Sequence, residues 1–214
     1  MIHSDLQLAL GDLLEVDTDR YPNTVRTRHL NAAIRGLELD LEGPWTKDIG
    51  SLSITAGTPT YDPRSDLAGA DLLFSQPELV FFTGSSGIVE LELLFWSDFT
   101  AAYRLQAADA GVPRYYAMRG RNLWVGPTPS EDLTLTIDFM GVYEALSAGG
   151  DTNLWTEEAT DLVLADAARR ACPWLLEEQR TPVFDSQVQE ESTRLLHHWS
   201  HELSRNRVME AEEV

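Results

Sequence analysis

The chain has 214 residues, of which 43% are hydrophobic, and its formal net charge is −19. The hydrophobic content argues against wholesale disorder. The charge argues against broad nucleic-acid binding and against anionic membrane surfaces, since both need clustered lysine and arginine. No apolar run approaches the roughly 18 residues that span a bilayer. The single Cys172 excludes an intramolecular disulfide and fits a protein made in a reducing cytoplasm.

Helical spacing of leucines predicts two helices at the start of the chain. The first covers about residues 5–16, with Ser4 as its N-cap, and the second covers about residues 24–41. The apolar stripe of the second helix consists of Leu30, Ile34, Leu37 and Leu41.

Alternating apolar and polar residues in the middle of the chain predict short strands. Strands are expected around residues 52–54 and 78–82, and a half-solvated strand is expected over residues 87–95. In that strand the apolar residues on one face are Val89, Leu91 and Leu93. Residues 133–143 alternate most clearly, so these segments together predict an antiparallel meander.

A short helix is expected between the strands, from about residue 97. Ser97 or Asp98 is the predicted cap. Its aromatic face consists of Trp96, Phe99 and Tyr103.

The segment from Ala110 to Ser130 contains no Asp or Glu, although the protein is strongly acidic. PRYYAM and NLWVGP read as two strands joined by the tight turn RGRN, in which Gly120 supplies backbone freedom. Tyr116 and Trp124 are expected either to fill a core or to join an interface. A stacking platform for nucleic-acid bases is a further alternative.

Helical patterns return near residue 156, where Thr156 is the predicted N-cap. Pro173 is expected to kink this helix or to mark a restart. A last helix is predicted over about residues 184–205, and residues 206–214 are expected to form a frayed tail.

The order of these elements predicts an α+β protein. Residues 1–48 and 151–205 are expected to supply a helical bundle, residues 49–150 an inserted antiparallel β lobe, and residues 206–214 a flexible tail.

No motif for bond-making chemistry stands out, so we predict that the protein is not an enzyme and holds no cofactor or metal. His197 and His201 are four residues apart, but Glu202 follows them, so the HExxH order of zinc proteases is absent. TGSSG lacks the spacing of a nucleophile elbow, and Cys172 is expected in a core. Two alternatives remain: a hydrolase that uses the histidines, and a glycan-binding β lobe with Trp96, Trp124 and Tyr115.

Several segments between Ile49 and Asn153 follow the order found in one family of phage proteins. They are LSITAGTPTYD, WSDFTAAY, GVPRYYAMRGRNLWVGPTP, LTLTIDFMGVYEALS, and DTNLW before the C-terminal helices. The chain resembles the head-to-tail connector, or adaptor, proteins of tailed bacteriophages. The likeness covers about two-thirds of the chain as a sum of short motifs.

The resemblance implies a structural protein in the virion neck, between head and tail. Such proteins form a ring, usually of twelve copies, beneath the portal protein. The ring extends the channel for DNA ejection and offers a docking surface to tail or stopper proteins. The C-terminal segment of several relatives inserts against the portal, and here we expect that segment to order only on assembly. The corresponding candidates are Arg205, Arg207, Val208, Met209 and Val214. Another neck or tail-completion protein is the alternative within this class.

The net charge agrees with this implied role. A lumen lined with carboxylates repels phosphate, so genomic DNA passes without specific binding. The same charge makes the subunits repel one another, so the portal is expected to act as the template for the ring. Candidate contacts with a neighbouring subunit or the tail are Arg114, Tyr115, Arg119 and Arg121.

Overall fold

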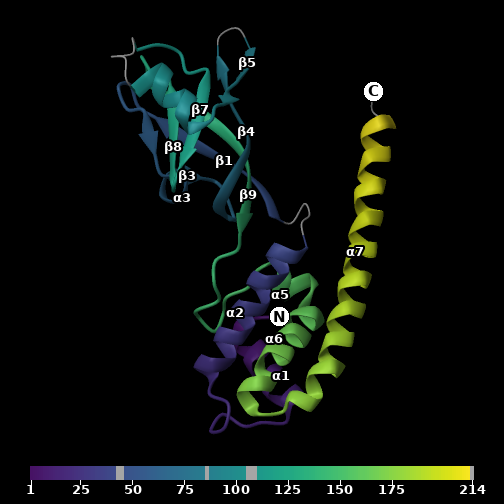
Figure 1. The fold of residues 1–214 in the computed structure, drawn as a ribbon. Coiled ribbons are helices and arrows are strands. Elements are labelled where there is room, and N and C mark those ends of the chain that lie inside the picture. Colours follow the sequence, from purple (N-terminus) through teal and green to yellow (C-terminus); the bar gives the residue numbers. More distant parts are fainter. Residues whose placement is uncertain (42–45, 85–86, 105–109, 213–214) are drawn as a thin grey trace. The chain divides into compact units, whose positions relative to one another are not determined.

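The structure is a computed structural model that describes residues 1–41, 46–84, 87–104 and 110–212, and the side chains of these residues up to Ser200, apart from Arg104. The chain divides into two compact units (Figure 1). The helical unit consists of Met1–Leu41 and Ala145–Val214, and the β unit consists of Glu42–Glu144. The predicted α+β class is confirmed.

The helical unit is organised around one central helix. Its elements are α1 (His3–Leu14), α2 (Asn23–Asp40), α5 (Leu154–Glu158), α6 (Thr160–Leu175), a 3₁₀ turn (Glu178–Arg180) and α7 (Thr181–Glu212). Helix α6 packs against α1, α2 and α7, and its central part is alanine-rich, which lets the neighbouring helices approach closely. None of the helices among the described residues is both long and apolar enough to cross a membrane.

Helix α6 buries a face of small and apolar side chains. Helix α7 buries few of its side chains among those described, which end at Ser200. Phe184, Leu195 and Trp199 are the buried members of α7. The Trp199 ring meets the Trp155 ring edge-on, with 6.1 Å between centroids. These contacts fix the first part of α7 against α5 and α6.

The helix ends differ from the sequence predictions. Helix α1 begins at His3, so Ser4 is not its N-cap. Asn153 rather than Thr156 caps α5: the Asn153 side chain accepts from the Thr156 backbone, and Thr156 Oγ1 accepts from the Asn153 backbone. Both residues can cap a helix, and the three-residue reciprocal pattern identifies the cap as the first of them.

The last helix is longer than predicted. Pro173 lies inside α6, which ends at Leu175, and the next residue, Leu176, has a φ of 60°. Helix α7 then begins at Thr181 and continues to Glu212, beyond Arg205.

Two sheets form the β unit. One has the order β3-β1-β9-β4-β5, with bounds Leu67–Ala68, Lys47–Ile54, Leu133–Val142, Leu73–Gly84 and Gly87–Glu90. The other has the order β2-β8-β7-β6, with bounds Thr60–Tyr61, Asn122–Gly126, Tyr115–Arg119 and Glu92–Leu93. All pairs are antiparallel except β6 with β7. The short elements α3 (Pro63–Asp66), α4 (Trp96–Phe99) and a π-helical turn (Thr100–Arg104) connect them.

The core of the β unit draws on both sheets. Leu135, Ile137 and Phe139 of β9 are fully buried, as are Leu52 of β1 and Leu123 of β8. Strand β9 pairs with β1 on one side and β4 on the other, so the most clearly alternating segment of the sequence is the central strand of its sheet.

The prediction of one continuous strand over residues 87–95 is wrong, because the chain passes from one sheet to the other within this segment. Strand β5 pairs with β4, and β6 pairs with β7 of the other sheet. Leu91 between them is buried, whereas Leu93 is 59% exposed. The change of sheet breaks the alternation, so Leu91 and Leu93 do not share an environment.

Candidate interaction surfaces

The acid-free segment forms the predicted hairpin from β7 and β8. Arg119 pairs with Asn122 across the turn, and Gly120 between them has a φ of 62°, which favours glycine. Arg119 and Arg121 lie together at this turn, and both are exposed. Arg114 is also exposed but precedes β7, so it lies at the opposite end of the strand from Arg119.

Aromatic side chains support the hairpin from one side. The Trp96 ring contacts Trp124 edge-on, with 5.4 Å between centroids, and stacks on Phe99 at 6.0 Å. Tyr103 continues the cluster to Phe99 and to Tyr115. The predicted aromatic face of the short helix is therefore correct, although Phe95, and neither Ser97 nor Asp98, is the N-cap residue.

Burial separates the aromatic residues from the arginines. Tyr116 is only 3% exposed and belongs to the core, and Trp124 is partly buried. Burial raises the pKa of the Tyr116 hydroxyl. The Arg119 guanidinium lies over the Trp96 ring, 4.7 Å from its centroid, which is a cation–π contact.

Phe95 adds an exposed apolar ring next to Trp96 in the chain. It directly precedes Trp96 and is 82% exposed. We call Phe95, Trp96, Arg119 and Arg121 the hairpin patch. Sequence patterns drew attention to its arginines but missed Phe95, because a single aromatic residue before a helix has no distinguishing pattern.

A second surface lies within the helical unit, where α1, α6 and α7 border a hollow of about 610 Å³. Its floor is apolar and consists of Ala9, Leu13, Leu164 and Ala165. Its rim carries the carboxylates of Asp12, Asp161, Glu190 and Glu191. We call these residues the acidic groove.

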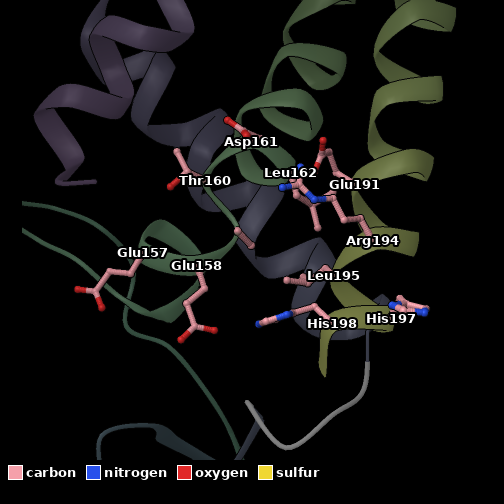
Figure 2. Close-up of a pocket in the computed structure, with 11 residues that line it drawn as sticks. Glu157, Glu158, Thr160, Asp161, Leu162, Glu191, Arg194, Leu195, His197 and His198 are labelled. Carbon is pink, nitrogen blue, oxygen red and sulfur yellow. Dashed lines mark hydrogen bonds and ion pairs between the residues drawn. The ribbon is translucent and has the colours of Figure 1, made fainter. Parts of the chain in front are cut away.

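A neighbouring hollow of about 600 Å³ extends the acidic groove along α6 and α7 (Figure 2). Asp161 and Glu191 line both hollows. Glu157 and Glu158 add two further carboxylates, while Arg194 supplies a cation that pairs with Glu191 at 3.4 Å. No ion pair within the described part of the chain reaches Asp12, Asp161 or Glu190.

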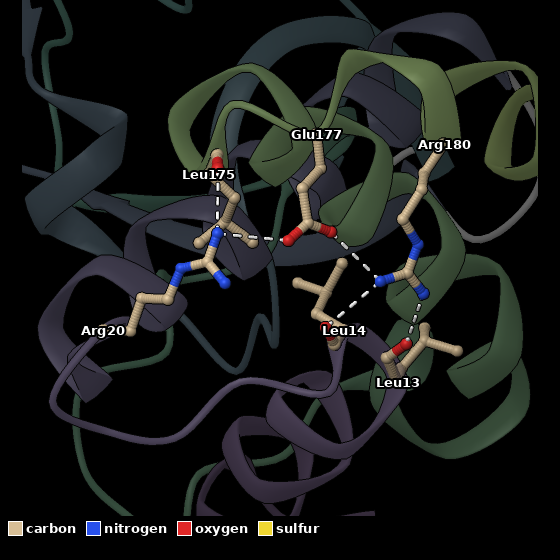
Figure 3. Close-up of polar contacts among 6 residues, drawn as sticks. All are labelled: Leu13, Leu14, Arg20, Leu175, Glu177 and Arg180. Carbon is tan, nitrogen blue, oxygen red and sulfur yellow. Dashed lines mark hydrogen bonds and ion pairs between the residues drawn. The ribbon is translucent and has the colours of Figure 1, made fainter.

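Polar contacts fix the ends of α1 and α6 and the start of α7 (Figure 3). Arg180, just before α7, donates to the Leu13 and Leu14 carbonyl oxygens at the end of α1, at 3.1 and 3.2 Å. Glu177 bridges Arg180 and Arg20, with 3.2 Å to each. Arg20 also donates to the Leu175 carbonyl at the end of α6, at 3.2 Å. Two arginines thus bind three carbonyl oxygens at two helix ends, and they connect the ends of α1 and α6 with the start of α7.

The histidines expected for a hydrolase are not assembled into a site in the described structure. His197 is exposed on α7, and the side chain of His201 lies outside the described residues. No group of three or more His, Cys, Asp or Glu side chains among those described is placed to hold a metal. Cys172 is fully buried, and burial raises the pKa of its thiol.

The candidate portal contacts lie in the part of α7 whose side chains are not described. The helix backbone includes Arg205, Arg207, Val208 and Met209, whereas Val214 lies outside the described residues. The predictions for these residues therefore stay predictions.

Comparison with known proteins identifies the family. No curated protein matches the chain. The model of the family described as "SU10 adaptor protein" matches residues 1–208, which include both units nearly in full. The chain therefore belongs to the SU10 adaptor protein family, and it is a phage adaptor protein.

Proposed function

We propose that this chain is a head-to-tail adaptor in the virion neck, where it forms a ring of twelve copies below the portal protein. The ring extends the DNA channel and docks the tail or a stopper protein. The observation that carries the proposal is the family match over residues 1–208.

The charge supports this role. Each copy carries −19, so a ring of such subunits presents a strongly acidic surface to the DNA that moves through it. Carboxylates repel phosphate groups within about a Debye length of 8–10 Å, which lets the DNA slide without being held. The same repulsion acts between copies, so ring assembly requires the portal as a template.

Two parts of the chain supply the contacts in this proposal. The exposed arginines of the hairpin bind a neighbouring subunit or the tail, because arginine with tyrosine or tryptophan is typical of interface anchors. The end of α7, from about Arg205, binds the portal.

The test is assembly with the cognate portal, measured by native mass spectrometry and negative-stain microscopy. We expect the chain alone to remain unassembled, and portal plus chain to give portal capped by a ring of one added copy per portal subunit. Portal alone and chain alone are the controls. A chain that stays solitary beside its portal contradicts the proposal.

A truncation separates the portal contact from folding. Removing residues 206–214 is expected to abolish portal binding while leaving the far-UV circular dichroism and the unfolding midpoint almost unchanged. Portal binding that survives the truncation would assign the contact to another surface.

No observation on the described residues favours the alternatives. The Trp96 ring already contacts Arg119, Phe99 and Trp124, which leaves less of the ring for stacking on a sugar. Another neck or tail-completion protein is distinguished by the same assembly experiment, because such a protein would bind the ring or the tail and leave the bare portal unoccupied.

A further inference from the structure

We propose that the hairpin patch of one copy docks in the acidic groove of the next copy around the ring. This inference rests on the proposed ring and names the two surfaces that join its subunits. The hairpin patch lies wholly within the β unit and the acidic groove wholly within the helical unit, so each surface is formed without the other.

The hairpin patch has the composition of an interface anchor. Its two arginines belong to a segment, Ala110–Ser130, that has three arginines and no carboxylate, in a protein with 35 acidic residues. Arg119 is held over Trp96, so less side-chain freedom is lost when it binds. Phe95, at 82% exposure, adds apolar area that water would leave on docking.

The acidic groove is complementary in both respects. Its apolar floor offers a place for the Phe95 ring and for the methylene groups of the arginines. Its rim carries Asp12, Asp161 and Glu190, which have no ion-pair partner among the described residues. Guanidinium groups form paired hydrogen bonds with carboxylates, so arginines suit this rim better than lysines would.

The use of two different surfaces suits a ring, in which each copy turns one surface to each neighbour. A contact between two different patches is heterologous, and repetition of such a contact closes a ring when the rotation fits. A two-fold dimer instead uses one patch that matches itself. Local attraction between hairpin patch and acidic groove also offsets the repulsion between copies of net charge −19.

Charge reversal tests the contact, because each side can be reversed separately. The hairpin variant carries Arg119→Glu and Arg121→Glu, and the groove variant carries Asp12→Arg and Glu190→Arg. All four side chains are exposed, and Asp12 lies in the last turn of α1, where a basic residue is favoured. Circular dichroism checks that each variant folds before it is mixed with portal.

We expect each variant alone to lose ring formation on portal by more than tenfold. An equimolar mixture of the two variants should recover ring formation. When the two variants alternate around the ring, each hairpin with glutamates faces a groove with arginines. Each unchanged hairpin then faces an unchanged groove. The matched control is a pair of single changes, Arg121→Glu and Arg28→Glu. Both reverse one exposed arginine, and only the first should weaken assembly.

Cross-linking provides a second readout that does not depend on charge. Gln187 also lines the acidic groove. Asn122→Cys at the hairpin and Gln187→Cys at the groove are introduced into one chain, whose native Cys172 is fully buried. On portal, mild oxidation is expected to link the chains into a ladder, and neither single variant should do so.

The outcomes separate this inference from the proposed function. If the wild type forms rings but the mixture does not recover and no ladder appears, the hairpin docks elsewhere and the inference is wrong. If the wild type forms no ring on portal, the proposed function fails, and the inference fails with it.

Discussion

The helical unit buries charged side chains among its apolar ones, whereas the β unit buries no charged side chain among its described residues. His3, Arg26, Glu38 and Asp166 are each at most 6% exposed, and all belong to the helical unit. In the β unit Thr46 is the one buried polar residue among those described. The stability of the helical unit thus depends in part on specific buried polar contacts, while that of the β unit depends on the packing of apolar side chains in its core. The four predictions below test that difference.

Removal of an apolar side chain from the β core is expected to have the largest effect. Phe139→Ala empties a fully buried site on the central strand β9, which costs about 3–5 kcal/mol. Chemical denaturation measures the loss. Thr134→Ala, at an exposed position of the same strand, is the control and should change stability by less than about 0.5 kcal/mol. Equal losses of stability at both positions would contradict a β unit that is stabilised by the packing of its core.

Loss of the buried arginine is expected to come next. Arg26 is 2% exposed and donates to the carbonyl oxygens of Tyr21, Gln7 and Val16, at 2.8, 2.8 and 2.9 Å. Arg26→Met removes these three buried hydrogen bonds, which costs about 3 kcal/mol. The readout is denaturation followed by far-UV circular dichroism.

Arg28→Met on the exposed face of α2 is the matched control for Arg26. If Arg26→Met were no more destabilising than Arg28→Met, the three carbonyls would not depend on the arginine, and the contrast between the units would weaken.

The helix-end contacts are expected to contribute less, because they are partly exposed. Arg180→Met removes two hydrogen bonds to the end of α1 and the ion pair with Glu177, at a cost of about 1–2 kcal/mol. Arg194→Met removes only an exposed ion pair and serves as the control. Similar unfolding midpoints for the two variants would show that Arg180 does not hold α1 to α7.

The smallest effect concerns acid stability. The Asp151 carboxylate accepts from the Ser147 and Ala148 backbone N–H groups, and these bonds lower the pKa of Asp151. Its contribution is therefore fully present above the ordinary carboxyl pKa, about 4, and is lost as the pH falls through the lower folded value. Denaturation midpoints from pH 7 to pH 2 should fall less steeply for Asp151→Asn than for the wild type. Parallel curves would contradict this assignment.

Much of the β unit could be predicted from its sequence. Alternation identified β9, and the pair of strands around Gly120 identified the hairpin, because a half-buried sheet repeats with a period of two. The prediction failed where the chain changes sheets at Leu91, since no local pattern marks a change of partner.

The helical unit was predicted only in outline. Leucine spacing located the helices, but the same reasoning places charges on the surface and so missed Arg26 and Asp166 in the interior. Asp166 is buried because Arg169 and Arg170, one turn later, pair with it. The acidic groove was missed for a related reason: Asp12, Asp161 and Glu190 come from three helices that are distant in sequence and meet only in the fold.

The pairing of β1 with β9 has a consequence for how this adaptor can change over evolution. Lys47, near the start of the β unit, lies opposite Met140, near its end. The chain thus departs from the helical framework and rejoins it along adjacent strands. In the topology of the helical unit, the β unit of about a hundred residues is therefore one long connection between two helices. Such a module can be enlarged, trimmed or exchanged while the framework that supports it keeps its own sequence constraints.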